Sequence, residues 1–197
     1  MIVLAVTGGI GSGKTHIVNM FASMGIPVYF TDDRAKGLYD SSGELLVALQ
    51  SILGEDIVQD GKLRKDIMAA RLFADKSLLA KVEGVVHPAV IKDFLKWKGE
   101  QKNVPFVIIE SAIFLENPLL RPLADKVLVI TSPIDLRIER VQRRSNLTRE
   151  QILGRMDNQW SDSEREKWAD YVIVSDEKRA LLPQIIGIYK ELEDGNR

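Results

Sequence analysis

The residues that decide the fold read Gly8-Gly9-Ile10-Gly11-Ser12-Gly13-Lys14-Thr15, close to the amino terminus. They fit the pattern G-x-x-x-x-G-K-[ST], in which backbone N–H groups of a glycine-rich loop surround phosphate oxygens. A dinucleotide-binding fingerprint is excluded, because Lys14 stands where its third glycine would be needed. The stretch therefore predicts a phosphate-binding loop, or P-loop, rather than a glycine-rich turn with an ordinary surface lysine.

The polar residues of the loop have defined chemical roles in this prediction. Lys14 is long enough to reach the β- and γ-phosphates and to offset the charge that develops during transfer. Thr15 offers a hydroxyl to Mg²⁺, a hard cation that prefers oxygen ligands. We therefore expect a nucleoside triphosphate and Mg²⁺ to bind here.

The sequence on both sides of the loop is patterned as strand, helix and strand. Residues 2–6 form a β-branched apolar run, 16–24 have helical spacing, and 26–30 resemble a second short strand. This succession is a βαβ unit, which is typical of a parallel sheet. Two further strand candidates, 106–109 and 127–130, are apolar on both faces, as in strands buried inside a parallel sheet. A last, short candidate is 171–174.

Two stretches interrupt the α/β pattern. Residues 34–103 have helical spacing and no confident strand, and residues 134–168 are charged and helical. We predict a single domain of the α/β class, a three-layer P-loop NTPase core with a parallel sheet. The core would comprise residues of about 1–33, 104–133 and 169–197, with the helical stretches as an insert and a lid.

The composition excludes several other classes of protein. The 197 residues include 27 Lys and Arg against 28 Asp and Glu, which argues against a broad nucleic-acid surface. Cysteine is absent, so thiolate catalysis and disulfides are excluded, and His16 and His87 alone cannot form a zinc site. No stretch approaches the ~20 apolar residues of a membrane span, and the amino terminus lacks a signal peptide's basic flank. We expect a cytoplasmic protein that binds neither nucleic acid nor membrane.

The loop alone does not identify the acceptor of the phosphoryl group. A guanine-binding Asn-Lys-x-Asp segment is absent, and the length favours a small-molecule kinase over a mechanical ATPase. Such a kinase needs a base for the acceptor hydroxyl, and a carboxylate after a neighbouring parallel strand suits that role. Asp32 and Asp33 follow the predicted strand 26–30. Either is a candidate base, with capping of the next helix as the alternative.

Beyond the loop, the chain resembles the dephospho-coenzyme A kinase family along essentially its whole length. The resemblance rests on residues 6–14, Asp32 with Ala35 and Lys36, Glu83 with His87-Pro88, Leu115-Glu116, the spacing of Arg140, Arg144, Arg155 and Gln159, and residues 169–173. Departures from the family's pattern occur at His16, Phe30, Arg64-Lys65, Glu110 and Ala112. These departures concern contacts to the coenzyme rather than the class of reaction.

The resemblance implies ATP-dependent phosphorylation of the ribose 3′-hydroxyl of 3′-dephospho-CoA, the last step of coenzyme A biosynthesis. It implies that Asp32 is the general base and that Lys14 and Arg140 assist transfer. The nucleotide-binding residues would be Gly8, Gly9, Ile10, Gly11, Ser12, Gly13, Lys14, Thr15, His16, Arg140 and Arg144, with Thr15 also a ligand of Mg²⁺. Asp32, Lys65 and His87 would bind the substrate, mainly through the insert at 34–103, and residues 134–168 would form the lid.

Several of these residues have a structural alternative. Arg137, Arg140 and Arg144 lie at i, i+3 and i+7, so a helix would present them on one side, to phosphate or merely to solvent. His87 precedes a proline, which favours an extended or turn segment, and it either contacts substrate or is structural. Glu110 either orients a Mg²⁺-bound water or is a buried charge satisfied by hydrogen bonds.

Two rival functions remain open on the sequence alone. The first is another small-molecule or nucleotide kinase, which a comparison of acceptors would distinguish. The second is a nucleotide-sensing module that binds ATP without turnover and tolerates loss of Asp32. We expect Trp97, Trp160 and Trp168 to be packing or lid-hinge residues rather than to bind adenine.

Overall fold

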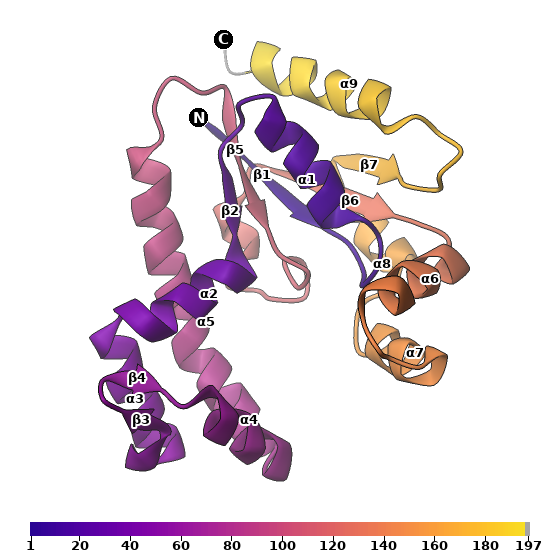
Figure 1. Ribbon diagram of the computed structural model, residues 1–197. Helices are drawn as coiled ribbons and strands as arrows, with labels where there is room; N and C mark the ends of the chain where they lie inside the picture. Colours follow the sequence, from indigo (N-terminus) through magenta and orange to yellow (C-terminus); the bar gives the residue numbers. More distant parts are fainter. Residues whose placement is uncertain (196–197) are drawn as a thin grey trace. The chain divides into compact units, whose positions relative to one another are not determined.

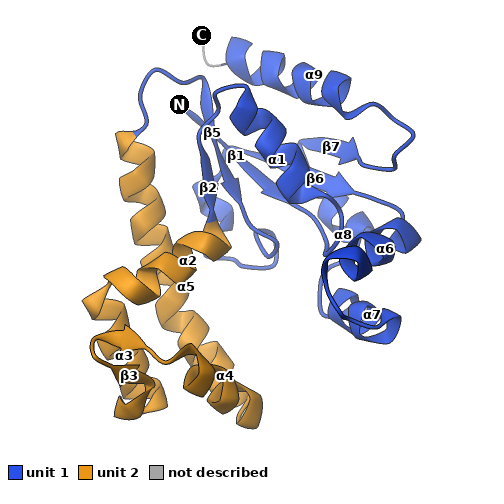
Figure 2. Ribbon diagram, in the orientation of Figure 1, with its two compact units in different colours: residues 1–30, 101–197 blue, residues 31–100 orange. Residues whose placement is uncertain are grey.

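The computed structural model describes residues 1–195, and the chain divides into two compact units (Figures 1 and 2). Unit 1 comprises residues 1–30 and the chain from 101 onward, and unit 2 comprises residues 31–100. The stretch 34–103, predicted as an insert, therefore falls largely in unit 2, and the stretch 134–168 belongs to unit 1. Their roles in substrate binding and closure stay predictions.

Unit 1 is built on a five-stranded sheet in the order β2-β5-β1-β6-β7. Its strands are β1 (Ile2–Thr7), β2 (Val28–Phe30), β5 (Phe106–Glu110), β6 (Lys126–Thr131) and β7 (Tyr171–Val174). Every neighbouring pair is parallel, which confirms the predicted α/β class. β2 is shorter than the predicted run 26–30, because Ile26 donates its N–H to Phe21 at the end of a helix and Pro27 has no N–H.

Helices α1 (Lys14–Ser23) and α9 (Leu181–Asp194) cover one face of this sheet (Figure 1). Their buried residues, Ile17, Val18 and Phe21 of α1 and Ile185, Ile188 and Leu192 of α9, join alternate strand residues in one hydrophobic cluster. Phe21 and Phe106 meet edge to face with ring centroids 6.1 Å apart. The short helix α8 (Asp162–Glu166) packs against β6. The core therefore fixes the start of α1, where the P-loop ends.

Two further helices of unit 1 carry the predicted lid. α6 (Ile134–Arg144) and α7 (Arg149–Asp157) share a small cluster of Ile138, Val141 and Ile152. Thr148 and Gln151 form a capping box that starts α7. α7 ends at Asp157, within the stretch predicted as helical, so Gln159 lies outside the helix. A short 3₁₀ turn, η2 (Arg121–Leu123), lies between β5 and β6.

Unit 2 contains helices α2 (Thr31–Ser41), α3 (Gly43–Leu53), α4 (Lys65–Ala74) and α5 (Ser77–Glu100), with the 3₁₀ turn η1 (Glu55–Ile57). The expectation that this stretch holds no strand was wrong. A small hairpin joins β3 (Val58–Gln59) to β4 (Lys62–Leu63) through Asp60-Gly61. Both turn residues have positive φ, 52° and 73°, which an Asp-Gly pair adopts in two-residue hairpins.

The segment around His87 also differs from the prediction. His87-Pro88 lies in the middle of α5, not in an extended or turn segment. Pro88 disfavours a helix locally, but α5 buries a stripe of apolar residues at every fourth position. The stripe comprises Val82, Val86, Val90 and Phe94. This packing outweighs the local preference of a single residue pair.

The edge strand β7 carries a side-chain contact on its outer backbone groups. Gln184, from α9, accepts a hydrogen bond from the N–H of Val174 at 3.1 Å and donates to its carbonyl at 3.4 Å. On the inner side, Ser175 N–H donates to Thr131 O of β6. None of the helices within residues 1–195 has the length and apolar character needed to cross a membrane.

Candidate active site

The P-loop occupies the turn between β1 and α1. Gly11 and Gly13 have φ of 78° and 97°, a left-handed conformation that glycine adopts without strain. Gly13 is the N-cap of α1, and no side chain caps the first N–H groups of that helix. The helix therefore begins with N–H groups that can bind an anion, as the sequence predicts.

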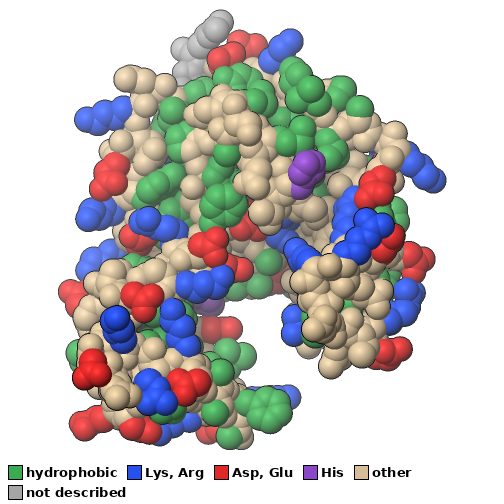
Figure 3. Space-filling view, in the orientation of Figure 1, with side chains coloured by type: hydrophobic (Ala, Val, Ile, Leu, Met, Phe, Trp, Pro, Cys, Tyr) green, Lys and Arg blue, Asp and Glu red, His purple; other side chains and the backbone are tan. Residues whose placement is uncertain are grey.

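A pocket of about 270 Å³ lies over this helix start. It is lined by Gly11, Ser12, Gly13, Lys14, Thr15, His16, Arg140 and Arg144. Figure 3 shows Lys and Arg side chains gathered around α6 and α7 on this side of unit 1. The structure thus brings the two predicted lid arginines to the P-loop. Gly8 and Gly9 are buried behind the lining residues, and Ile10 is partly buried.

Lys14 lies back over its own loop. Its Nζ donates to Gly8 O at 2.8 Å and approaches Gly9 O at 3.4 Å. The ammonium is therefore held at the loop, where phosphates would bind, and its position depends on the loop's carbonyls.

Arg140 and Arg144 differ in how they are held. Arg140 donates to Ser132 Oγ and to Ser175 O, both at 3.2 Å, and pairs with Glu177 at 3.1 Å. Arg144 is exposed, and within residues 1–195 its side chain makes no hydrogen bond or ion pair. Arg140 is thus fixed at the pocket wall, whereas Arg144 is available to a ligand.

Arg137 is not on a solvated helix face. Its residue is only 6% exposed, and it lies under the loop, where Nε donates to Ile10 O at 2.9 Å. One terminal nitrogen contacts both carboxylate oxygens of Asp162 at 3.2 Å. Burial lowers the pKa of Arg137, while the charge of Asp162 raises it, and the group stays charged at neutral pH.

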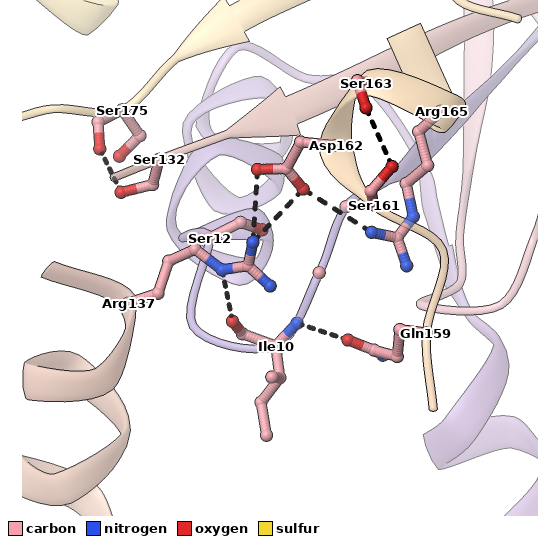
Figure 4. Close-up of polar contacts among 12 residues, drawn as sticks. Ile10, Ser12, Ser132, Arg137, Gln159, Ser161, Asp162, Ser163, Arg165 and Ser175 are labelled. Atoms are coloured by element: carbon pink, nitrogen blue, oxygen red, sulfur yellow. Dashed lines mark hydrogen bonds and ion pairs between the residues drawn. The ribbon is translucent and has the colours of Figure 1, made fainter. Parts of the chain in front are cut away.

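Gln159 contacts the same loop residue from the other side. Its Oε1 accepts the N–H of Ile10 at 2.9 Å (Figure 4). The sequence offered Gln159 only as a position of family-like spacing, with no role. Arg155, of the same spacing, is exposed on α7.

A buried ionic network continues from Arg137, and sequence reasoning missed it. Asp162 also lies 3.6 Å from Arg165, which is fully buried and pairs with Glu116 at 2.6 Å. Arg121 lies over Trp160 and Trp168, 5.2 Å and 4.8 Å from the ring centroids. These two tryptophans therefore pack on a guanidinium.

The predicted substrate residues all lie in unit 2, on three different helices. Asp32 is exposed in the first turn of α2, two residues after β2 ends, and is inside the helix rather than its N-cap. Lys65 pairs with Asp40 at 3.4 Å, and His87 lies in α5. A pocket of about 470 Å³ in this unit is lined mainly by α2, α3 and α5, and Pro88 contributes to it, whereas Lys65 and His87 are not among its lining residues.

Glu110 ends β5 beside the strand that leads into the P-loop. It is buried and lies in register with Val6 of β1 and Phe30 of β2. This location is compatible with both roles considered for it, a ligand-directed carboxylate and a buried structural charge.

Comparison with known proteins gives one consistent result. A family model for dephospho-CoA kinase matches residues 2–180. The dephospho-CoA kinase of Bacteroides fragilis is 35% identical over 183 residues, covering 93% of this chain and 89% of the relative. That of Porphyromonas gingivalis is 36% identical over 189 residues, covering 95% and 93%.

Solved structures agree with the fold. A protein from Thermus thermophilus superposes with a TM-score of 0.80 at 27% identity, covering 98% of this chain and 97% of that one. A dephospho-CoA kinase from Campylobacter jejuni has a TM-score of 0.70 at 24% identity, covering 99% and 98%. A shikimate kinase from Acinetobacter baumannii shares the fold more distantly, at 0.57 and 16%, covering 99% and 94%. The P-loop, its arginine-lined pocket and the matches along nearly the whole chain lead to one conclusion: this protein is a kinase that belongs to the dephospho-CoA kinase family.

Proposed function

We propose that this chain transfers the γ-phosphoryl group of ATP to the ribose 3′-hydroxyl of 3′-dephospho-CoA, giving ADP and coenzyme A. The observation that carries the proposal is the pocket in unit 1, where a complete P-loop and two arginines surround one helix start. Membership of the family supports the choice of acceptor.

The cationic groups of the pocket account for binding and activation of the donor. The loop's N–H groups and Lys14 bind the phosphates, and Lys14 offsets the charge that develops on the transferred group. Arg140 is held at the wall by Ser132 and Glu177, so it gives a fixed positive field. Arg144 is the arginine free to contact phosphate directly, and guanidinium forks suit phosphate oxygens.

Asp32 is the proposed general base. It takes the proton of the acceptor hydroxyl as the oxygen attacks the γ-phosphorus, and the bond to the β-phosphate oxygen breaks. Its carboxylate is exposed, and its neighbour Asp33 instead pairs with Lys36 at 2.9 Å. Asp32 is therefore the better candidate of the two acidic residues.

The donor set of the loop fits Mg²⁺. Thr15 is exposed at the pocket and supplies a hydroxyl oxygen, the ligand type that Mg²⁺ prefers. Within residues 1–195 there is no group of three His, Cys, Asp or Glu side chains suited to a metal. A magnesium ion held mainly by phosphates and water needs only one or two protein ligands. When bound with ATP, it would reduce the negative charge on the phosphates.

A coupled assay of ADP release tests the proposal. With ATP and Mg²⁺, dephospho-CoA should support fast release, while adenosine and shikimate should give only the acceptor-free background. Equal release with all acceptors would contradict the assignment, and ATP binding without any acceptor-dependent release would favour a sensing module.

The role of Asp32 is tested by Asp32→Asn, with Asp33→Asn as the matched control. The first change should lower kcat by about 10²–10⁴. The dissociation constant for ATP should stay within about twofold, because the P-loop is unaltered. The control should retain near-normal turnover. If Asp32→Asn turned over as fast as the control, the base would have to be another group.

A further inference from the structure

We propose that Arg137, held in place by Asp162, is a positioning residue that fixes the shape of the P-loop before nucleotide binds. The inference rests on the proposed function only in taking ATP as the ligand of the loop. The contacts that support it all lie in unit 1.

The first observation is that both polar groups of Ile10 are bound by side chains from the carboxyl-terminal half of the chain. Figure 4 shows the carbonyl of Ile10 accepting from Arg137 and its N–H donating to Gln159, each at 2.9 Å. Ile10 lies at the middle of the loop, between Gly9 and Gly11. Gln159 therefore occupies the Ile10 N–H that was predicted to bind nucleotide, and Arg137 holds the carbonyl, so the middle of the loop is fixed from two sides.

The second observation is the close packing of α6 against the loop glycines. A Cβ added to Gly9 would overlap the guanidinium of Arg137, and one added to Gly11 would overlap the backbone carbonyl of Arg137. Glycine at these two positions therefore permits the close approach of Arg137 to the loop. Arg137 lies against the loop backbone at Gly9 and Gly11 and also bonds Ile10, so we expect removal of its side chain to change the conformation of the loop.

The third observation is that Arg137 is itself held by a buried charge pattern. Asp162 lies between Arg137 and Arg165, and Arg165 is bound by Glu116, so the charges alternate along the network. Arg137 and Arg165 are 6% and 0% exposed, so solvent screens these contacts little. A buried guanidinium with such partners has few alternative positions.

These contacts have a consequence for nucleotide binding. A loop that is already in its binding conformation loses less conformational entropy when the ligand arrives. Lys14 donates to Gly8 O and Gly9 O, so its ammonium depends on the same loop geometry. Loss of Arg137 should therefore weaken ATP binding without affecting the site of the second substrate.

The test compares Arg137→Met with Arg143→Met. Both remove a guanidinium from α6, but Arg143 is exposed and pairs with Glu139 on its own helix. Arg137→Met should weaken ATP binding about tenfold to hundredfold, the range for one lost hydrogen bond to a charged group. The KM for dephospho-CoA should stay within about twofold, because it depends on other residues. Arg143→Met should match the wild type, and Arg137→Lys should restore part of the affinity.

Hydrogen exchange separates positioning from a general loss of structure. In Arg137→Met, amide exchange in the loop at residues 9–13 should rise, while exchange in β1 and β6 should stay at the wild-type rate. If exchange rose equally in loop and strands, or if folded Arg137→Met bound ATP like the wild type, the proposal would be overturned. Should Arg137→Met fail to fold, Asp162→Asn must give the same loop-specific increase in exchange, and an unchanged loop there would also overturn it.

The outcome is separable from the proposed reaction. ATP affinity is measured by direct titration without acceptor, so it reports on Arg137 even if dephospho-CoA proves not to be the substrate. Conversely, a wild-type enzyme that binds ATP but gives no acceptor-dependent ADP release contradicts only the proposed function.

Discussion

Replacing Glu116 should reveal how strongly the buried ionic network stabilises unit 1. The carboxylate of Glu116 accepts from the side chain of Arg165 at 2.6 Å and from the backbone N–H of Trp160 at 3.3 Å. Arg165 has no exposed side-chain surface, and the Glu116 side chain is 17% exposed. Without Glu116, the ionic partner left to Arg165 among residues 1–195 would be Asp162, at 3.6 Å.

The expected magnitude follows from this burial. Removing one partner of a buried pair costs about 3–5 kcal/mol, because the remaining charge loses its compensation. Glu116→Leu should therefore lower the free energy of unfolding by about that amount, and the melting temperature by about 6–20 °C at ~2–4 °C per kcal/mol. Glu116→Gln keeps an acceptor for Arg165 and should cost about 1–3 kcal/mol.

Urea unfolding at neutral pH, followed by tryptophan fluorescence and circular dichroism, measures both variants. The matched control is Glu164→Gln, which breaks a pair with Lys167 between side chains that are both more than half exposed. It should change the free energy of unfolding by less than about 1 kcal/mol. A Glu116→Leu variant no less stable than this control would show that Arg165 does not need its carboxylate, and the reasoning on the network would fail.

Other parts of the chain give further predictions. Burial and then a hydrogen bond to a neighbouring carboxylate raise the pKa of Tyr171 to about 12. A raised pKa means that the folded state favours the protonated tyrosine. The resulting stabilisation is complete below the unfolded pKa of about 10 and is lost between about pH 10 and 12. In urea unfolding across that range, Tyr171→Phe should therefore lose less stability than the wild type. Gly84 lies in a helix with open space around it, so Gly84→Ala should add about 0.5–1 kcal/mol to the free energy of unfolding. Gly25 has φ of 88°, so Gly25→Ala should lower that free energy by about 1–2 kcal/mol. Thermal melts that ranked the two variants alike would contradict this. Arg144→Met should raise the KM for ATP about two- to fivefold with Arg143→Met unchanged, and steady-state kinetics that failed to separate them would remove Arg144 from the site.

The sequence predicted the features that depend on local pattern. The P-loop, the parallel strands and the helix after the loop follow from glycine spacing and from apolar runs, and all lie within unit 1. The convergence of Arg140 and Arg144 on the loop could be anticipated only from the family resemblance, since they are more than a hundred residues away in the chain.

The missed features depend on contacts distant in sequence. Arg137 was predicted to face phosphate or solvent, and Arg165 was given no role, because nothing near them in the chain marks them as buried. Their partners, Ile10 and Glu116, lie 127 and 49 residues away. The prediction of an extended or turn segment at His87-Pro88 was wrong because it considered local preference without the buried stripe of α5. Local rules fail where tertiary packing supplies the larger free energy.

The side chain of Gln184 has a consequence for self-association. An outermost strand presents a row of unbonded peptide groups onto which another chain can add. On β7, Gln184 already occupies the donor and the acceptor of Val174, so an intruding segment would first have to displace an amide from both. β7 and β2 are also the shortest strands of the sheet, with four and three residues. The longer apolar strands β1, β5 and β6 lie inside the sheet, so both of its edges are short, which disfavours the addition of a strand from another chain.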